Sequence, residues 1–226
     1  MKRTLVREVM TTPVVTAGEA MPFRDLAALL YAKDIGAVPV IAVAGQVLGV
    51  VSGCDLTAKA AGLDTETGSR LESRSRRRER RRARARTAGE LMTAPAITVT
   101  PEATIEQAAR VMHRHQVGRL PVTLRLTGRL AGIVTRADLL RVYLRPGEDI
   151  RTEILAGVLT RISGADPGRL TVSVRNGVVS ISGRVERRSA VSGLVRATLE
   201  VEGVIGVDHD IAFDVDDRYS IIPAGF

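Results

Sequence analysis

The chain has 226 residues, of which 45% are hydrophobic, so it is long enough to form two modest domains with apolar cores. Aromatic residues make up only 3%, which disfavours an aromatic base-stacking surface, and the single cysteine, Cys54, excludes an internal disulfide and a Cys-based zinc cluster. The formal net charge of +8 is concentrated in residues 70–86, which contain ten Arg and two Glu, and the rest of the chain is neutral.

Two segments near the N-terminus bear on location. Arg3, Arg7 and Glu8 stand where a secretory signal peptide needs an apolar run, and we therefore expect a cytoplasmic protein. Residues 35–54 include no charged residue over 20 positions, which is about the length of a membrane span. Pro39 and the turn residues between two β-branched runs favour two strands and a turn instead.

An internal repeat organises the first two thirds of the chain. Val9-Met10-Thr11-Thr12-Pro13 aligns with Leu91-Met92-Thr93-Ala94-Pro95 at an offset of 82 residues. The same offset aligns Gly36-Ala37-Val38-Pro39-Val40 with Gly118-Arg119-Leu120-Pro121-Val122. One residue is then added in a hairpin, where insertions are tolerated best, and the alignment continues at an offset of 83. Two copies of one supersecondary unit are therefore expected.

Each copy has the pattern of a short strand, a helix, two strands and a second helix. Gly36 and Gly118 are predicted to stop the first helix, and Thr104 with Gln107 is predicted to form a capping box in the second copy. The apolar helical face comprises Phe23, Leu26, Ala27 and Leu30 in one copy and Ile105, Ala108, Ala109 and Met112 in the other. The paired strands are predicted at 38–43 and 47–51, and at 120–126 and 130–134.

Each copy ends with a strand that runs directly into a helix, with Ser52 or Thr135 at the junction and Asp55 or Asp138 three residues later. A helix N-terminus presents unpaired N–H groups and a partial positive charge that suit a phosphate, while a nearby carboxylate can accept hydrogen bonds from a ribose. The same spacing is also a helix-capping box, which stabilises the helix without any ligand. The residues alone leave both roles open.

Over roughly residues 5–145 the chain resembles a tandem pair of CBS domains, a Bateman module. The resemblance rests on Met-Thr-x-Pro at the start of each copy, the Pro-Val strands, and Gly-h-h-Ser/Thr-x-x-Asp at the end, where h is an apolar residue. It implies two repeats packed around a pseudo-twofold axis, with adenine nucleotides or related adenosyl compounds bound in the clefts between them. It also implies that modules pair into a homodimer.

The resemblance assigns roles to residues of both copies. Asp55 and Asp138 would hold ribose, and Ser52 and Thr135 would hold phosphate. The strands that follow the two start motifs would line the base pocket. The candidates there are Val14, Thr16, Ile97 and Thr98.

Two arginines distinguish the copies. Arg119 and Arg136 stand where the first copy has Ala37 and Gly53, and a guanidinium suits bidentate contact with phosphate. If one cleft alone is occupied, we therefore expect it to be the cleft of the second copy. The alternative is that both arginines are solvated surface residues.

Residues 70–86 carry the basic run between the copies. They have almost no apolar periodicity, so they form either a solvated helix or a disordered linker. Such a run can also bind RNA, DNA or anionic lipid by counterion release.

From about Asp149 a third pattern gives the order helix, strand, strand, helix, strand. Asn176-Gly177 is the strongest hairpin signal in the chain, Ser182-Gly183 is predicted to stop the second strand, and Gly203 the last helix. The helical faces are Ile150, Ile154, Leu155 and Val158, then Val191, Leu194, Val195 and Thr198.

This third unit resembles a BON domain through Val-Arg-Asn-Gly-Val-Val-Ser-Ile-Ser-Gly-Arg-Val and the later Val-Glu-Gly-Val-Ile-Gly-Val. That family is associated with phospholipid membranes or other hydrophobic ligands, and often with envelope proteins.

The predicted fold is therefore α+β, with two pseudo-symmetric β-α-β-β-α CBS repeats and a small α-β-β-α-β BON domain. The predicted boundaries are 1–68 for the first repeat, 69–87 for the Arg-rich linker, 88–146 for the second repeat, 149–216 for the BON domain and 217–226 for a tail.

No catalytic or metal-binding constellation is found in the sequence. His113 and His115 are two apart on a helix, so they point to different faces. The chain is predicted to be a non-enzymatic regulator that binds ATP, ADP, AMP or an adenosyl compound, with no catalytic cofactor. The regulated protein is not identified by the sequence, and the BON domain would be an output or an interaction module. The alternative is a dimeric adaptor or stress protein that binds nucleic acid or anionic lipid through the Arg-rich segment.

Overall fold

The computed structural model describes residues 3–60 and 84–217. The Arg-rich linker predicted at 69–87 lies outside the described residues as far as residue 83, and so does the tail beyond Asp217. The chain divides into two compact units, an N-terminal unit of Thr4–Leu139 and a C-terminal unit that begins at Leu140. No helix in the described part of the chain is long and apolar enough to cross a bilayer.

The first repeat has the predicted order of elements, preceded by a short helix that was not predicted. Helix α1 (Val6–Val9) precedes strand β1 (Ala17–Gly18), helix α2 (Phe23–Ala32), strands β2 (Ala37–Ile41) and β3 (Val47–Ser52), and helix α3 (Gly53–Ala60). β1 pairs with β2 in parallel, and β2 pairs with β3 as an antiparallel hairpin. The segment of residues 35–54 is thus the predicted pair of strands and not a membrane helix.

The second repeat follows the same plan. It comprises α5 (Ala88–Leu91), α6 (Ile105–His115), β4 (Arg119–Thr123), β5 (Leu130–Thr135) and α7 (Arg136–Leu140). The capping box of Thr104 and Gln107 is confirmed, with hydrogen bonds of 2.9 Å and 3.3 Å between each backbone N–H and the other side chain. The predicted first strand of this repeat is reduced to one parallel bridge between Val99 and Val122.

Two details of the predicted repeats are wrong. β2 and β4 end at Ile41 and Thr123, earlier than predicted, because the apolar residues beyond them lie in exposed hairpin tips. Helices α2 and α6 are not stopped by Gly36 and Gly118. The left-handed backbone that ends each helix is adopted earlier, by Asp34 at φ 49° and by Gln116 at φ 53°.

The short helix at the start of each repeat, α1 or α5, packs against the other repeat. Val6 N–H donates to the Ala103 carbonyl, so α1 is attached to the second repeat. Ala88 and Leu91 of α5 are fully buried in the core of the first repeat, where they pack with Leu26, Val38, Val40 and Val51. The helix before the first start motif therefore packs on the second repeat, and the helix before the second start motif packs on the first repeat.

Bridges between strands reinforce this exchange. Thr11 pairs with Ile133 of β5, and Thr93 pairs with Val50 of β3, each through two backbone hydrogen bonds. The hairpin turns also pair, through Gln46 and Arg129. The strands that carry the two Ser/Thr-x-x-Asp motifs are thus held by the opposite start motif.

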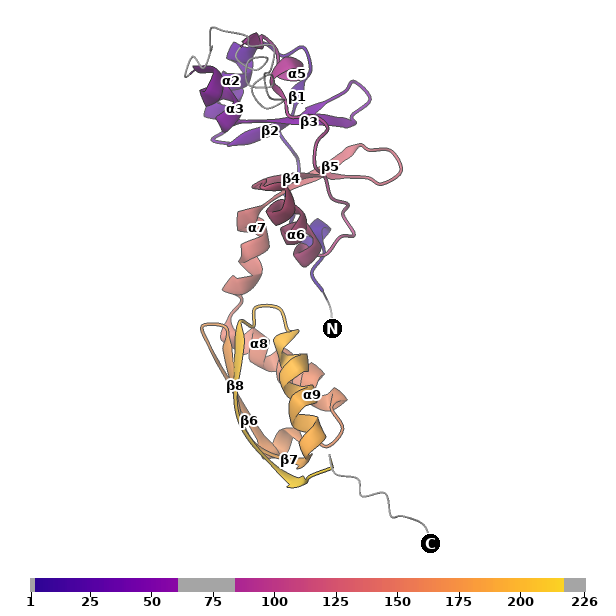
Figure 1. Cartoon of the computed structure of the whole chain (residues 1–226), viewed down its shortest axis with the longest axis vertical. Coiled ribbons are helices and arrows are strands. Elements are labelled where there is room, and N and C mark those ends of the chain that lie inside the picture. Colours follow the sequence, from indigo (N-terminus) through magenta and orange to yellow (C-terminus); the bar gives the residue numbers. More distant parts are fainter. Residues whose placement is uncertain (1–2, 61–83, 218–226) are drawn as a thin grey trace, which may run out of the picture. The chain divides into compact units, whose positions relative to one another are not determined.

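The C-terminal unit has one three-stranded sheet with helices on one face (Figure 1). Its sheet order is β6 (Leu170–Arg175), β7 (Val178–Arg187), β8 (Gly206–Val215), with β6 antiparallel and β8 parallel to β7. A short 3-10 segment (Arg141–Leu144) leads to α8 (Gly147–Glu153). This helix continues through a π-helical turn (Ile154–Val158) and a 3-10 turn (Leu159–Arg161), and a last 3-10 turn (Pro167–Arg169) precedes β6. Helix α9 (Arg188–Leu199) connects β7 to β8.

The hairpin predicted at Asn176-Gly177 is confirmed, since both residues have positive φ, 50° and 78°, as a two-residue turn of this type requires. The predicted stop at Ser182-Gly183 is wrong, because β7 continues to Arg187. Gly183 has φ 128°, and a Cβ there would lie 2.2 Å from the Arg169 carbonyl oxygen. This glycine allows the close approach of two strands and does not end one.

Candidate functional site

The two Ser/Thr-x-x-Asp motifs adopt the same local geometry at the ends of β3 and β5. In the first, the Asp55 carboxylate accepts hydrogen bonds from the Ser52 backbone N–H at 2.8 Å and the Ser52 hydroxyl at 2.6 Å. In the second, the Asp138 carboxylate accepts the corresponding bonds from Thr135 at 2.8 Å and 2.7 Å. The Thr135 hydroxyl in turn accepts from the Asp138 N–H at 3.3 Å. Both motifs therefore form the helix cap that was one of the two predicted roles.

The two aspartates of these caps are more buried than acidic side chains usually are. Asp55 is 7% exposed and Asp138 is 8% exposed, although charged side chains are rarely this buried without partners. The hydrogen bonds from Ser52 and Thr135 offset the cost of removing each side chain from water. The two motifs thus place a hydrogen-bonded pair of hydroxyl and carboxylate groups at corresponding positions of the two repeats.

The glycine that opens each paired strand is bonded to the start of the following helix. The Gly36 carbonyl accepts from the Gly53 N–H at 2.9 Å, and the Gly118 carbonyl accepts from the Arg136 N–H at 3.1 Å. The first N–H of each helix is therefore already used by the protein. A ligand at either motif has to use the remaining polar groups or displace part of the cap.

The two arginines are distributed differently from the sequence prediction. Arg119 is the register partner of Thr135 in the second repeat, but its guanidinium reaches the first repeat, where a Cβ on Gly36 would lie 2.8 Å from it. Arg136 remains at its own motif and donates to the Val117 carbonyl at 3.3 Å. The Arg119 guanidinium therefore lies near Gly36 of the first repeat, and the Arg136 guanidinium lies near Gly118 of the second. The two arginines are not gathered at the motif of the second repeat.

The predicted base-lining residues are only partly gathered by the structure. Val14, Thr16, Ile97 and Thr98 are all half-buried. A cavity of about 290 Å³ lies between the repeats, and of this predicted set only Val14 lines it. The other lining residues are Pro13, Ile41, Gly45, Arg129, Leu130 and Ala131. Pro13 belongs to the start motif beside Val14, whereas sequence reasoning missed the other five because they come from the two hairpins, whose pairing with each other has no local signal.

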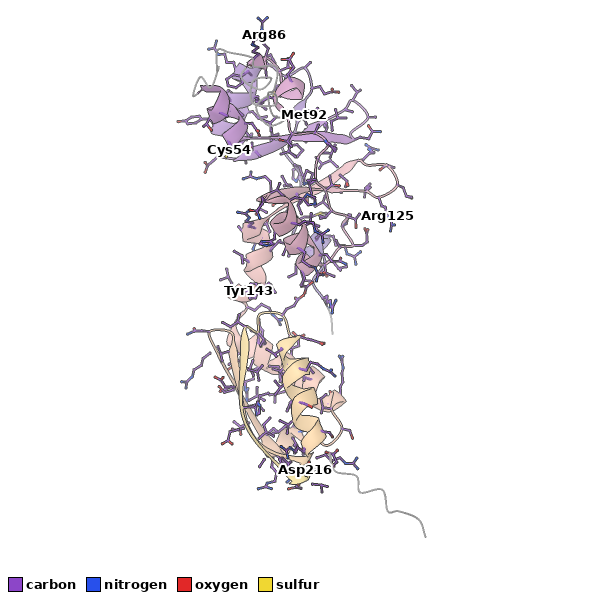
Figure 2. The ribbon with its side chains drawn as sticks, in the orientation of Figure 1. Cys54, Arg86, Met92, Arg125, Tyr143 and Asp216 are labelled. Atoms are coloured by element: carbon purple, nitrogen blue, oxygen red, sulfur yellow. The ribbon has the colours of Figure 1, made fainter. Side chains whose placement is uncertain are left out.

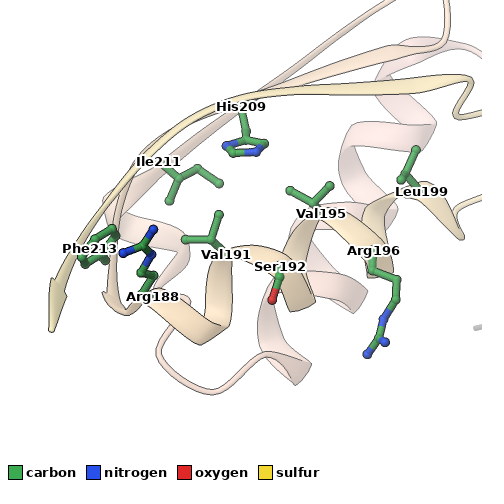
Figure 3. A pocket seen from close by; sticks show the side chains of 9 residues that line it. All are labelled: Arg188, Val191, Ser192, Val195, Arg196, Leu199, His209, Ile211 and Phe213. Atoms are coloured by element: carbon green, nitrogen blue, oxygen red, sulfur yellow. The ribbon is translucent and has the colours of Figure 1, made fainter. Parts of the chain in front are cut away.

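A larger groove of about 560 Å³ lies in the C-terminal unit, between α9 and β8 (Figure 3). It is lined by Arg188, Val191, Ser192, Val195, Arg196 and Leu199 from the helix, and by His209, Ile211 and Phe213 from the strand. Its apolar side chains point across the gap between helix and strand in Figure 3.

No group of three or more His, Cys, Asp or Glu side chains within the described ranges could hold a metal ion. Cys54 is exposed on α3 (Figure 2).

Comparison with known families identifies both units. The CBS domain model matches residues 6–62 and 88–145, and the BON domain model matches residues 147–214.

Individual relatives match the N-terminal part. Hypoxic response protein 1 of Mycobacterium tuberculosis is 33% identical over 140 residues, which is 61% of this chain and 84% of that protein. The crystal structure of CBSX2, a CBS-pair protein of Arabidopsis thaliana, in complex with AMP is similar with a TM-score of 0.54 and 27% identity, covering 62% of this chain and 96% of that chain. The CBS domain pair of protein MJ0100 in complex with 5'-methylthioadenosine and S-adenosyl-L-methionine shares the fold, with a TM-score of 0.50 and 22% identity over 63% of this chain and 97% of its own.

Proposed function

Because the chain belongs to the CBS-domain family and carries a BON domain after its CBS pair, we propose that it is a non-enzymatic regulatory protein whose CBS pair binds an adenine nucleotide or a related adenosyl compound. The observation that carries this proposal is the pair of buried motifs, Ser52 with Asp55 and Thr135 with Asp138, in matching hydrogen-bonded geometry. The likeness to an AMP-bound CBS pair supports the same ligand class.

Regulation follows if the ligand binds two conformations of the protein with different affinity. The shift between them is then limited by that difference in binding free energy. The start motifs couple the repeats directly, because each is hydrogen-bonded to the strand that carries the opposite Ser/Thr-x-x-Asp motif. In this proposal the ligand alters the contact of the two repeats or the pairing of two chains. The BON unit transmits the change to a regulated protein, or binds a membrane or hydrophobic ligand.

The test is thermal unfolding of the full chain with ATP, ADP, AMP and S-adenosylmethionine at millimolar concentration. A ligand present at 100 times its dissociation constant should stabilise the protein by about 2.7 kcal/mol. Asp138→Ala or Asp55→Ala should reduce the shift, whereas Asp25→Ala, an exposed acidic residue in the first turn of α2, should leave it unchanged. No shift with any of the four compounds would contradict the proposal.

The alternative function rests on the basic run of residues 70–86. An adaptor that binds nucleic acid or anionic lipid there should lose affinity steeply as salt is raised. The deletion that tests it should stop at residue 83, because Ala85 is buried in the core of the first repeat and the Arg86 carbonyl accepts from the Phe23 N–H. Unchanged binding in a chain without residues 70–83 would exclude this alternative.

A further inference from the structure

The groove between α9 and β8 has an apolar floor supplied by two elements. Val191, Val195 and Leu199 are spaced four residues apart and therefore share one face of α9. Ile211 and Phe213 are two residues apart on β8 and point to the same side of the sheet. These two rows face each other in Figure 3.

This apolar surface is only partly covered by the protein. Val191, Ile211 and Phe213 pack against the core of the C-terminal unit but remain half-buried, and Leu199 is 49% exposed. The groove volume of about 560 Å³ lies within the range of roughly 300–1,000 Å³ that is typical of small-molecule sites. Covering these side chains with a hydrocarbon group would remove more apolar area from water.

The rim of the groove is basic. Arg188, Ser192 and Arg196 form a second row on α9, beside the apolar one, and no Asp or Glu lines the groove. Arg188 is already neutralised, because it pairs with Asp216 at 2.5 Å and lies over the Phe213 ring at 5.2 Å. Arg196 is exposed and takes part in no ion pair within residues 3–60 and 84–217. The charge that remains to be matched is therefore at the Arg196 end.

We propose that this groove binds a medium-chain carboxylate. Its hydrocarbon chain lies between the helix row and Ile211, and its carboxylate pairs with the guanidinium of Arg196, an exposed side chain that points away from β8 in Figure 3 and turns toward the groove when the ligand binds. A guanidinium can form two parallel hydrogen bonds with a carboxylate, which fixes the head group at one end of the groove. A cationic head group is disfavoured because the groove has no acidic residue to receive it. This inference deepens the ligand role proposed for the BON unit and rests on it, but it does not depend on nucleotide binding by the CBS pair.

The experiment is a calorimetric titration of sodium decanoate, below its micelle concentration, into the full chain. We expect one site. The affinity should fall by up to about fourfold for each methylene removed from the chain, and octanoate has two methylenes fewer than decanoate. Decanol and decyltrimethylammonium should bind more weakly than decanoate. Vesicles of phosphatidylglycerol provide the second arm, since they present an anionic lipid surface but no free carboxylate chain.

Two pairs of variants locate the site. Val195→Asn should reduce decanoate affinity at least tenfold, whereas Val215→Asn, at an exposed position of β8 outside the groove, should not. Arg196→Ala should reduce it about two- to fivefold, as for an exposed ion pair, whereas Arg175→Ala, another exposed arginine, should not. Circular dichroism of each variant checks that the fold is retained.

Two results would overturn the proposal: no decanoate binding, whether or not vesicles bind, or equal binding of decanol and decanoate. Binding to vesicles without binding of decanoate would preserve a membrane role for the BON unit while removing this site. An ATP titration of the same samples reports on the CBS pair separately.

Discussion

The sulfur of Met10 occupies the space above Gly132: a Cβ built on Gly132 would lie 2.5 Å from the Met10 Sδ. The second start motif repeats this contact, since a Cβ on Gly49 would lie 2.6 Å from the Sδ of Met92, which lies next to β3 (Figure 2). The glycine of each Gly-h-h-Ser/Thr motif is therefore required for packing between the repeats. Its presence needs no ligand to explain it.

The two glycines should differ in their sensitivity to substitution. At Gly132 the three atoms nearest to a new Cβ all belong to the Met10 side chain, whereas at Gly49 the three nearest include the Thr93 carbonyl oxygen at 2.8 Å. The methionine side chain can move to another rotamer, whereas the Thr93 backbone is held by its hydrogen bonds to Val50. Gly49→Ala should therefore lower the free energy of unfolding more than Gly132→Ala, within about 1–3 kcal/mol for an overpacked site. Urea unfolding of both variants measures the difference.

Rescue by a second substitution is the control for this explanation. Met10→Ala should recover part of the stability lost in Gly132→Ala, and Met92→Ala should recover less in Gly49→Ala. Equal rescue at the two sites would show that the Thr93 carbonyl does not decide the cost.

Arg119 should recognise the phosphate of the proposed nucleotide. Arg119→Ala is expected to lower the affinity for AMP by about ten- to hundredfold, as for the loss of a hydrogen bond to a charged group, and to leave the affinity for adenosine unchanged. Calorimetric titrations with both ligands measure this selectivity. Arg114→Ala, an exposed arginine on α6, is the matched control. A loss of the same size for adenosine would indicate a structural role.

The location of the Arg119 guanidinium beside Gly36 predicts which motif it serves. The effect of Arg119→Ala on AMP should persist when Asp138→Ala removes the second motif and should be small when Asp55→Ala removes the first. The opposite pattern would restore the sequence-based expectation that Arg119 acts with Thr135 and Asp138.

Two glycines of the C-terminal unit should respond to alanine in opposite directions. Gly183→Ala should destabilise the unit by several kcal/mol, because its Cβ would collide with the Arg169 carbonyl and φ is 128°. Gly193 lies inside α9 with its nearest neighbour, Ile162 Cδ1, at 3.7 Å from the Cβ position, so Gly193→Ala should stabilise by up to about 1 kcal/mol. Thermal unfolding followed by circular dichroism tests both. A stabilised Gly183→Ala variant would contradict the close approach of β6 and β7.

Asp214 should make the stability of the C-terminal unit depend on pH. Its carboxylate accepts from Arg169 at 2.9 Å and from Arg184 at 3.2 Å, and the hydrogen bond from Arg169 is the main reason that its pKa lies below the ordinary value of 3.8. Because the folded state has the lower pKa, this contribution is present above pH 3.8 and is lost as the pH falls through the folded-state pKa.

Asp214→Asn should therefore lower the unfolding temperature at pH 7, and the difference from the unmodified protein should disappear in strong acid. Asp210→Asn, on the same face of β8, provides the control for removal of a charge without these two arginines. A difference that stays constant from pH 7 to strong acid would exclude this ion pair as the cause.

Local patterns were sufficient for most of the fold. The order of the long helices and the paired strands was predicted correctly because side-chain periodicity and turn residues are properties of neighbouring positions. The short helices α1 and α5 were not predicted, and the first strand predicted for the second repeat is a single bridge. The cap that joins Thr135 to Asp138 was predicted for the same reason, since both partners lie within one helical turn. The prediction at Gly183 is wrong because a glycine can either end a strand or permit a close contact, and this one permits a close contact with the Arg169 carbonyl.

The sequence by itself thus determined two repeats, a third α/β unit, and the residues of both Ser/Thr-x-x-Asp motifs. Only the tertiary structure decided that α1 and α5 exchange between repeats, that the Arg119 guanidinium lies beside Gly36, and that α9 and β8 leave an apolar groove with a basic rim. Periodicity specifies which face of an element is buried, but not which distant element covers it. That choice depends on packing between residues that can lie more than 80 positions apart, as Arg119 and Gly36 do.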